Sequence, residues 1–176
     1  GPPLVILASH QDELPGIHAF HIEAAGNALA QAQPLTDDNT AQLAVADIDG
    51  DGGEDLVALV RAADDSLSLV IIPSTPDGWG PPRSRPLAAV LPDLRPSSVT
   101  LALGDLDLDD AVDAVLVDRG ASARFMDIGS DLPLAPLIDT VENDGDAVGI
   151  ADLNDDGRPD LALCSPDGVS IALTTP

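Results

Sequence analysis

Apolar and polar residues alternate in short blocks along the whole chain. Runs rich in Leu, Val, Ala and Ile are separated by segments that contain Asp, Gly, Pro or Ser. Short apolar runs bounded by such turns are typical of β-strands. Residues 24–32 have helical propensity, but Gly26 and Asn27 favour a turn. The pattern predicts an all-β protein with strands over residues 4–7, 16–22, 42–46, 56–61, 67–72, 83–90, 99–103, 114–117, 123–128, 134–138, 147–150, 161–164 and 169–173.

One acidic loop lies between apolar runs at three places in the chain. In each copy, oxygen-bearing side chains occupy positions 1, 3, 5 and 9. Four such groups within nine residues repel one another unless a cation lies among them, and hard oxygen ligands at alternate positions of a tight loop suit Ca²⁺. The candidate ligands are Asp47, Asp49, Asp51 and Asp55, then Asp105, Asp107, Asp109 and Asp113, then Asp152, Asn154, Asp156 and Asp160.

The spacing of the loops predicts a repeat architecture. Their first aspartates, Asp47, Asp105 and Asp152, are 58 and 47 residues apart. Periods in this range indicate propeller blades or arrays, and about four short strands in each period fit a four-stranded antiparallel propeller blade. We expect one repeat domain, a partial β-propeller of two complete blades flanked by two incomplete ones. Its units are an incomplete blade without a metal loop over residues 1–40, calcium-binding blades over 41–95 and 96–142, and an incomplete calcium-binding blade over 143–176.

An EF-hand is the main competing interpretation of these loops. That motif needs a bidentate acidic ligand at position 12 and flanking helices. Position 12 is Ala58, Leu116 or Leu163 here, and the last acid comes at position 9 in every copy. The sequence therefore excludes an EF-hand and favours a loop between two strands.

The chain resembles the calcium-binding FG-GAP/VCBS repeats of integrin α-subunit propellers and of many secreted bacterial proteins. The resemblance rests on the nine-residue acidic loop, on the apolar strand that follows it, and on a downstream segment from Asp77 to Pro82 with Trp79 in the aromatic position. It implies about three Ca²⁺ ions, each fixing the hairpin between the first two strands of a blade. It also implies a further ligand at position 7, the backbone carbonyl of Gly53, Ala111 or Arg158.

The second loop departs from the pattern at position 6. Asp110 stands there, whereas the other loops have Gly52 and Gly157. The sharp turn is expected to require a positive φ, which Asp adopts less readily than Gly. We therefore expect the second site to be weaker than the other two. Acidic turns without metal are the alternative for all three loops, and any ion bound is expected to be structural rather than catalytic.

Charge narrows the range of partners. The chain has 31 acidic and 7 basic residues, which gives a net charge of −24. Nucleic acids and anionic membranes need clustered basic residues, so neither is an expected partner. The chain also lacks a run of about 20 apolar residues, so no membrane insertion is expected. A hydrophobic content of 44% is enough for a folded core.

No catalytic constellation is recognisable. Cys164 is the sole cysteine and is expected to be a small buried hydrophobe, while His10, His18 and His21 are expected to be exposed. The resemblance implies a non-enzymatic module, extracellular or at the cell surface, for adhesion, assembly or ligand binding. Its partner would be a protein or glycan, or a second copy joined through the incomplete blades. A scaffold domain of a larger secreted, polysaccharide-active enzyme is the alternative.

Overall fold

The computed structural model describes residues 4–9, 16–21, 33–36, 39–62, 64–88, 91, 99–118, 122–128, 136–142 and 147–173. All regular structure in these ranges is β-strand, which confirms the all-β prediction. Within them no helix is long and apolar enough to cross a membrane. Residues 24–32 and His10 lie outside the described ranges.

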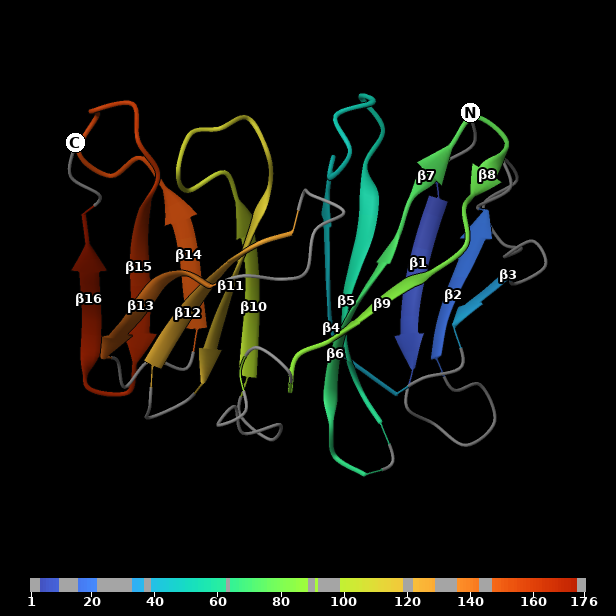
Figure 1. The fold of residues 1–176 in the computed structure, drawn as a ribbon, viewed down its shortest axis with the longest axis horizontal. Coiled ribbons are helices and arrows are strands. Elements are labelled where there is room, and N and C mark those ends of the chain that lie inside the picture. The colour runs from blue at the N-terminus through green and yellow to red at the C-terminus, as the bar shows by residue number, and fades with distance from the viewer. Residues whose placement is uncertain are drawn as a thin grey trace.

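Apart from one two-stranded hairpin, the described strands form four antiparallel sheets that follow one another in chain order (Figure 1). The first sheet contains β1 (Leu4–Ser9), β2 (Gly16–His21) and β3 (Gln33–Thr36). The second contains β4 (Asn39–Ala46), β5 (Asp55–Arg61), β6 (Leu67–Ile72) and β9 (Arg83–Pro86). The third contains β10 (Val99–Gly104), β11 (Asp113–Asp118), β12 (Ser122–Asp127) and β13 (Pro136–Glu142). The fourth contains β14 (Ala147–Ala151), β15 (Asp160–Ser165) and β16 (Gly168–Ala172).

Most of the expected strands are present within a few residues of their predicted bounds. The strand expected over 83–90 already ends at Pro86, and the one expected over 134–138 runs from Pro136 to Glu142. A small hairpin of β7 (Ser74–Thr75) and β8 (Gly78–Trp79) was not predicted. A hydrogen bond from the Gly80 N–H to the Pro73 carbonyl, at 2.8 Å, joins the two strands at the end away from the turn.

The sheets pack face to face in a row, and alternate residues of each strand serve opposite faces. The second sheet contacts the first with one face and the third sheet with the other. Val57, Leu59, Leu69 and Ile71 meet Ala114, Leu116, Met126 and Ile128 in one core, whereas Leu56, Ala58, Val60, Val70 and Ile72 share another core with Ile17. The third sheet meets the fourth through Val115, Val117, Ala123, Phe125, Leu161 and Leu163.

The first strands of neighbouring sheets lie side by side. β10 lies beside both β4 and β14, and β1 lies beside β4. The Gln42 side chain joins β4 to β10, because its amide donates to the Val99 carbonyl at 3.0 Å and accepts from the Leu101 N–H at 2.6 Å. Gly104 lets β10 approach β14, since a Cβ there would lie 3.0 Å from Ile150 Cγ2. This arrangement brings the three acidic loops to the same edge of the row (Figure 1).

Two expectations about burial were wrong. Cys164 is exposed, because it belongs to the face of β15 that no described sheet covers. His18 is buried with 5% of its surface exposed, next to Ile17, which packs against the second sheet. In both cases the strand was predicted, but the side of it that another sheet covers was not.

Candidate metal centres

Each acidic loop closes the hairpin between the first two strands of a sheet. In all three hairpins the residue before position 1 pairs with the aspartate at position 9: Ala46 with Asp55, Gly104 with Asp113, and Ala151 with Asp160. The three loops are therefore equal in length, and the strands that flank them pair in the same register. Identical closure gives the side chains at positions 1, 3, 5 and 9 the same starting geometry.

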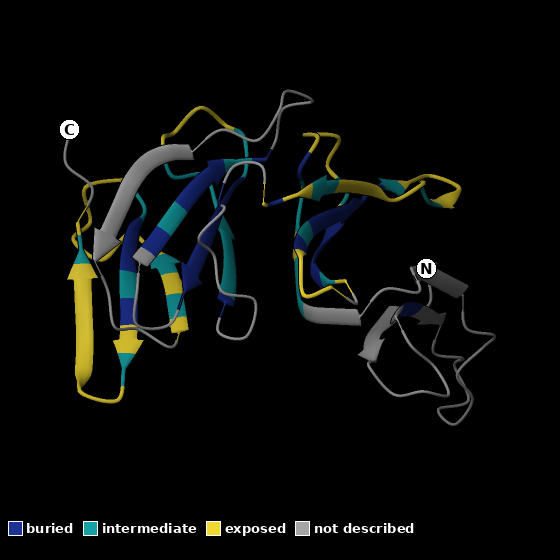
Figure 2. Ribbon diagram, turned by 60° about the horizontal axis from the view of Figure 1, so that its bottom comes forward, coloured by how far each residue is buried: buried dark blue, intermediate teal, exposed yellow. Residues whose placement is uncertain are grey.

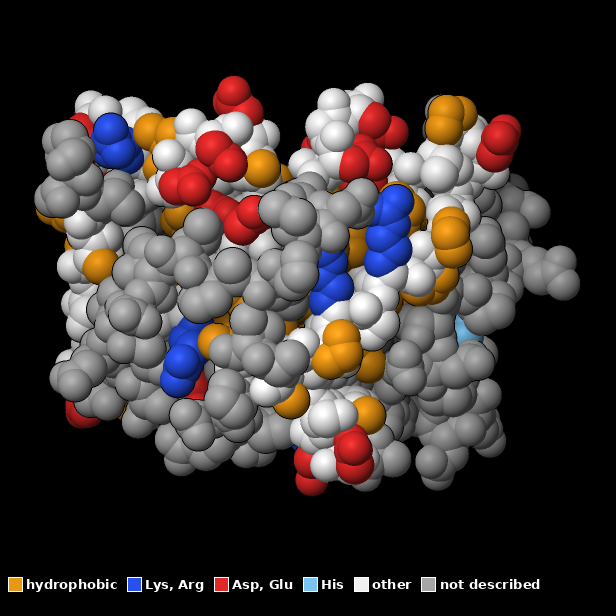
Figure 3. Space-filling view, viewed as in Figure 1, with side chains coloured by type: hydrophobic (Ala, Val, Ile, Leu, Met, Phe, Trp, Pro, Cys, Tyr) orange, Lys and Arg blue, Asp and Glu red, His pale blue; other side chains and the backbone are white. Residues whose placement is uncertain are grey.

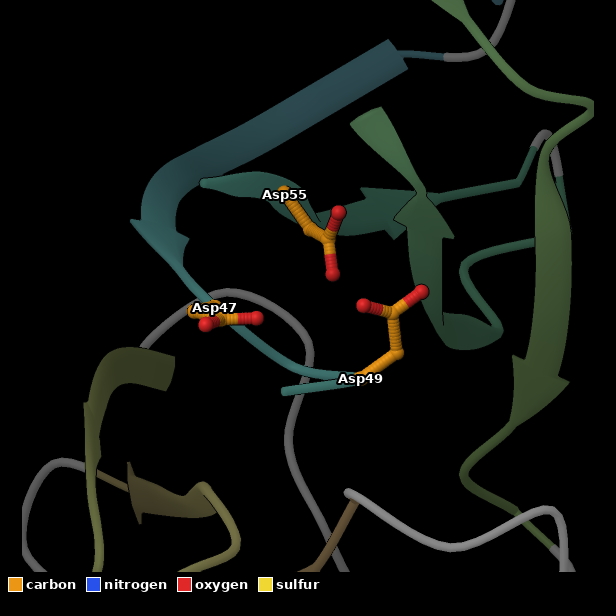
Figure 4. A group of neighbouring side chains, drawn as sticks. All are labelled: Asp47, Asp49 and Asp55. Atoms are coloured by element: carbon orange, nitrogen blue, oxygen red, sulfur yellow. The ribbon is translucent and has the colours of Figure 1, made fainter. Parts of the chain in front are cut away.

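In the first loop, three carboxylates converge. Asp47 follows β4, Asp49 lies in the loop, and Asp55 begins β5. Figure 4 shows their side chains directed toward a shared space, and one oxygen of each lies within 4.8 Å of the others. This group could hold a metal ion. In the second loop a convergent group is formed by Asp105, Asp107 and Asp109, which occupy positions 1, 3 and 5, whereas the first loop uses positions 1, 3 and 9.

Backbone N–H groups hold the carboxylates at positions 1 and 5 of every loop, although the donors to position 1 differ: they lie at positions 4 and 6 in the first loop and at positions 5 and 6 in the other two. At position 1, Asp47 accepts from the N–H groups of Gly50 and Gly52, both at 2.9 Å. Asp105 accepts from Asp109 and Asp110 at 3.2 and 3.1 Å, and Asp152 accepts from Asp156 and Gly157 at 3.1 and 2.8 Å. The position 5 aspartates accept from the residue two further on, at 2.7 to 2.9 Å: Gly53 to Asp51, Ala111 to Asp109, and Arg158 to Asp156.

The position 9 aspartates are the buried members of the loops. Asp55 and Asp113 are 1% exposed and Asp160 is 0% exposed. Each accepts a hydrogen bond from the N–H at position 2, which belongs to Ile48, Leu106 or Leu153. Burying a carboxylate costs free energy unless hydrogen bonds or a cation compensate it. These aspartates therefore anchor the loop on the sheet, and Asp55 is also a member of the convergent group of its loop.

Two residues near the loops could not be recognised from sequence spacing. The Ser74 N–H, at the start of β7, donates to Asp55 at 2.7 Å, so the β7–β8 hairpin is tied to the first loop. A Cβ on Gly53 would collide with the Ser74 side chain, which shows how closely the hairpin and loop pack. In the second loop, Asp127 of β12 stands opposite Asp113 in the strand register. Both lie far from the loops in sequence, so only the antiparallel pairing reveals them.

The charge on the second loop is poorly compensated by the protein alone. The pKa of Asp113 is raised to about 6, chiefly because burial disfavours its charged form, and the charges of Asp107, Asp109 and Asp127 raise it further. The pKa of Asp107 is raised as well, first by burial and then by the charge of Asp109. Such a group of carboxylates ionises more readily when a cation lies among them.

The third loop repeats the backbone geometry with an amide at position 3. The Asn154 side-chain oxygen accepts from the Asp156 N–H at 2.9 Å, and its nitrogen donates to the Asp156 carboxylate at 3.1 Å. Among the described residues, three acidic side chains converge only in the first and second loops. The remaining predicted ligands are not part of a convergent group and stay predictions: Asp51, Asp113, Asp152, Asn154, Asp156, Asp160 and the position 7 carbonyls of Gly53, Ala111 and Arg158.

The backbone is left-handed at positions 4 and 6 of every loop. Position 6 has φ of 86° at Gly52, 67° at Asp110 and 82° at Gly157, as expected for the sharp turn. At position 4, φ is also positive, at Gly50, Leu108 and Asp155. Nothing in the sequence indicated this second left-handed position. A side chain other than Gly in this region costs about 1–2 kcal/mol. The second loop has two non-glycine residues in this region, Leu108 and Asp110.

Replacing Asp110 by Gly is expected to increase stability by about 0.5–1 kcal/mol, because relief of backbone strain exceeds the added entropy of the unfolded chain. Gly52→Ala is the matched reverse change. A Cβ on Gly52 would meet nothing within 4 Å, so its effect comes from the backbone alone, and we expect a loss of about 1 kcal/mol. Urea unfolding in excess chelator measures the change in the free energy of unfolding for both variants. If both variants unfolded at the wild-type midpoint, the strain argument would be wrong.

Comparison with protein-family models gives no match, and neither does comparison with curated proteins.

Proposed function

We propose that this chain is a calcium-stabilised, non-catalytic module of β-propeller blades that works outside the cell or at its surface. The observation that carries the proposal is the threefold repetition of one loop geometry, with convergent carboxylates in two copies. The ligands are hard oxygens, which favour Ca²⁺ or Mg²⁺ over softer metals. Loops that offer many carboxylate and carbonyl oxygens favour the larger ion, Ca²⁺, because Mg²⁺ keeps several waters and is bound through one or two carboxylates.

The blade interpretation is supported by the row of sheets. In a propeller, four-stranded antiparallel sheets pack face to face around an axis. Here the sheets contain three, four, four and three strands, and their first strands lie beside one another. The resemblance to FG-GAP/VCBS repeats fits this arrangement, because in that family the metal loop joins the first two strands of a blade.

A structural role for the ion follows from the composition of the loops. The side chains at positions 1, 5 and 9 are each held by backbone N–H groups, which fix their orientation. A fixed cage of this kind stabilises a hairpin and leaves little freedom for an exchanging substrate. Binding of a protein or glycan, or assembly, is the function that such a rigid scaffold supports, and FG-GAP/VCBS repeats serve adhesion.

Trp79 offers a direct test, because it is the single tryptophan and is linked to the first loop. Asp55 accepts from the Ser74 N–H, and Ser74 stands opposite Trp79 in the β7–β8 hairpin. We expect Ca²⁺ to change the tryptophan fluorescence with a midpoint of about 10⁻⁴–10⁻³ M, and an equal concentration of Mg²⁺ to change it much less.

Two variants sharpen this titration. Asp49→Ala should abolish the calcium response, whereas Asp107→Ala, the same change in the second loop, should leave it in place. A wild-type emission that calcium does not change would argue against binding at the first loop. A response that both variants retain would place the ion elsewhere.

A further inference from the structure

Several aspartates of the described chain are followed directly by glycine. They are Asp49, Asp51, Asp77, Asp156 and Asp167, and one further pair, Asp144–Gly145, lies outside the described residues. All five described aspartates are exposed, and acidic side chains stand at the surface both over the acidic loops and over the β7–β8 hairpin (Figure 3). Exposure alone therefore does not separate these residues, but their hydrogen bonds do.

An Asp–Gly pair can undergo a covalent rearrangement that needs only water. The glycine nitrogen bonds to the side-chain carboxyl carbon of the aspartate, its proton and the carboxyl hydroxyl leave as water, and a cyclic succinimide forms. Water then opens the ring at either carbonyl, which restores aspartate or yields isoaspartate, whose backbone runs through the former side chain. Glycine favours the reaction because no Cβ hinders its nitrogen. The carboxyl group must be able to turn toward that nitrogen, so a hydrogen bond that holds it elsewhere slows the reaction.

In the acidic loops, both reacting groups are held. The Asp51 carboxylate accepts from the Gly53 N–H at 2.7 Å, and the Gly52 N–H donates to Asp47 at 2.9 Å. The other two loop pairs repeat this arrangement: Asp49 and Asp156 accept from the N–H groups of Asp51 and Arg158 at 3.2 and 2.9 Å, and Gly50 and Gly157 donate to Asp47 and Asp152 at 2.9 and 2.8 Å.

The remaining two pairs lie in two copies of one hairpin turn. Each turn has the order Ser or Thr, Pro, Asp, Gly, and its first residue pairs with its glycine: Thr75 with Gly78, and Ser165 with Gly168. Both turns are exposed (Figure 2). Among the described residues, none donates a hydrogen bond to the carboxylate of Asp77 or Asp167. In these turns the glycine is held by strand pairing, whereas the carboxyl group is not held.

We propose that Asp77 and Asp167 are the described residues at which this chain converts to isoaspartate, and that the loop aspartates are protected. The difference is the hydrogen bond that must break before a loop carboxyl group can turn. Breaking one typical hydrogen bond lowers the population of the open form about fivefold. This assignment does not require calcium, although an ion held by the loop carboxylates would widen the difference.

Conversion at Asp77 reaches the first acidic loop through the β7–β8 hairpin. Isoaspartate adds one carbon to the backbone of the turn, so the turn no longer fits the pair of Thr75 with Gly78. Ser74 and Trp79 form the next pair, and the Ser74 N–H donates to Asp55 at 2.7 Å. Trp79 packs against the core between the first and second sheets. We therefore expect conversion to expose Trp79 and to shift its emission to longer wavelength.

The test is labelling in heavy-oxygen water, with the folded protein kept at neutral pH in the presence of calcium. Each ring opening adds a labelled oxygen, and mass spectrometry of peptides locates it. Asp77 and Asp167 should take up label about fivefold faster than Asp51 and Asp156. In guanidinium chloride, where these hydrogen bonds are lost, the rates should become similar. Equal rates in the folded protein, or faster labelling in the loops, would overturn the proposal.

Asp77→Glu is the matched variant, because it keeps the charge but needs a larger ring. It should take up far less label at this position, leave labelling at Asp167 unchanged and abolish the slow shift of the Trp79 emission. A shift that persists in this variant would overturn the role given to Asp77. Repeating the labelling in excess chelator separates this proposal from calcium binding. If no ion binds, the ratio of rates stays above one and is the same in both conditions, whereas a ratio of one in both overturns the assignment.

Discussion

Adding excess chelator is expected to lower the melting temperature of the protein by roughly 3–15 °C, and restoring calcium should reverse the change. With dissociation constants of about 10⁻⁴–10⁻³ M, 1 mM calcium adds about 0.4–1.4 kcal/mol at each loop by mass action. Three loops together supply a few kcal/mol, a large part of the roughly 5–15 kcal/mol that stabilises a typical domain. For a domain of this size, 1 kcal/mol corresponds to about 2–4 °C.

Charge repulsion within the loops strengthens this expectation. Asp113 is 1% exposed and its pKa is raised to about 6, so without a cation its charged form is less stable in the folded protein than in the unfolded chain. Magnesium is the control for general ionic effects, and we expect it to restore less of the melting temperature than calcium does. A melting curve that is the same in chelator and in calcium would rule out a stabilising ion.

Asp55→Ala is expected to destabilise the protein by about 2–4 kcal/mol even in excess chelator. Its carboxylate is buried and accepts from the Ile48 N–H at 3.1 Å and from the Ser74 N–H at 2.7 Å. Alanine would leave two N–H groups without this acceptor, and each such buried group costs about 1–3 kcal/mol. Urea unfolding with and without calcium separates this cost from the loss of metal binding.

Asp49→Ala is the matched control for that variant. Asp49 belongs to the same convergent group but is exposed and accepts a single longer bond, from the Asp51 N–H at 3.2 Å. We expect the Asp49→Ala variant to lose the calcium-dependent stability of the first loop. In chelator, its free energy of unfolding should differ from that of the wild type by less than about 0.5 kcal/mol. Equal losses for the two variants in chelator would show that burial of Asp55 does not anchor the loop.

The regular features of this fold were predictable because they are local. Short apolar runs between turn residues give the strands, and an acidic loop of fixed length gives the same hairpin register each time, as at Asp55 and Asp160. The positive φ at position 6 was also predictable, because a turn this sharp requires it. The positive φ of Leu108 was not, since a leucine gives no sequence signal for a left-handed backbone.

Features that depend on pairing or stacking could not be predicted. Asp127 approaches Asp113 only because β11 and β12 pair in one particular register. Ser74 reaches Asp55 only because the chain turns back after β6. The exposure of Cys164 depends on whether a sheet covers its face, and an apolar strand looks the same in sequence with one or both faces covered.

Equilibrium dialysis against calcium tests the central claim most directly, by counting the ions that each chain binds. The three loops predict about three Ca²⁺ per chain at saturation, with the second site the weakest because of the strained backbone at Leu108 and Asp110. Asp49→Ala, Asp107→Ala and Asp156→Ala should each remove one ion from the count. The account would be contradicted if no calcium were bound at saturating calcium concentrations, or if none of these variants changed the number of bound ions.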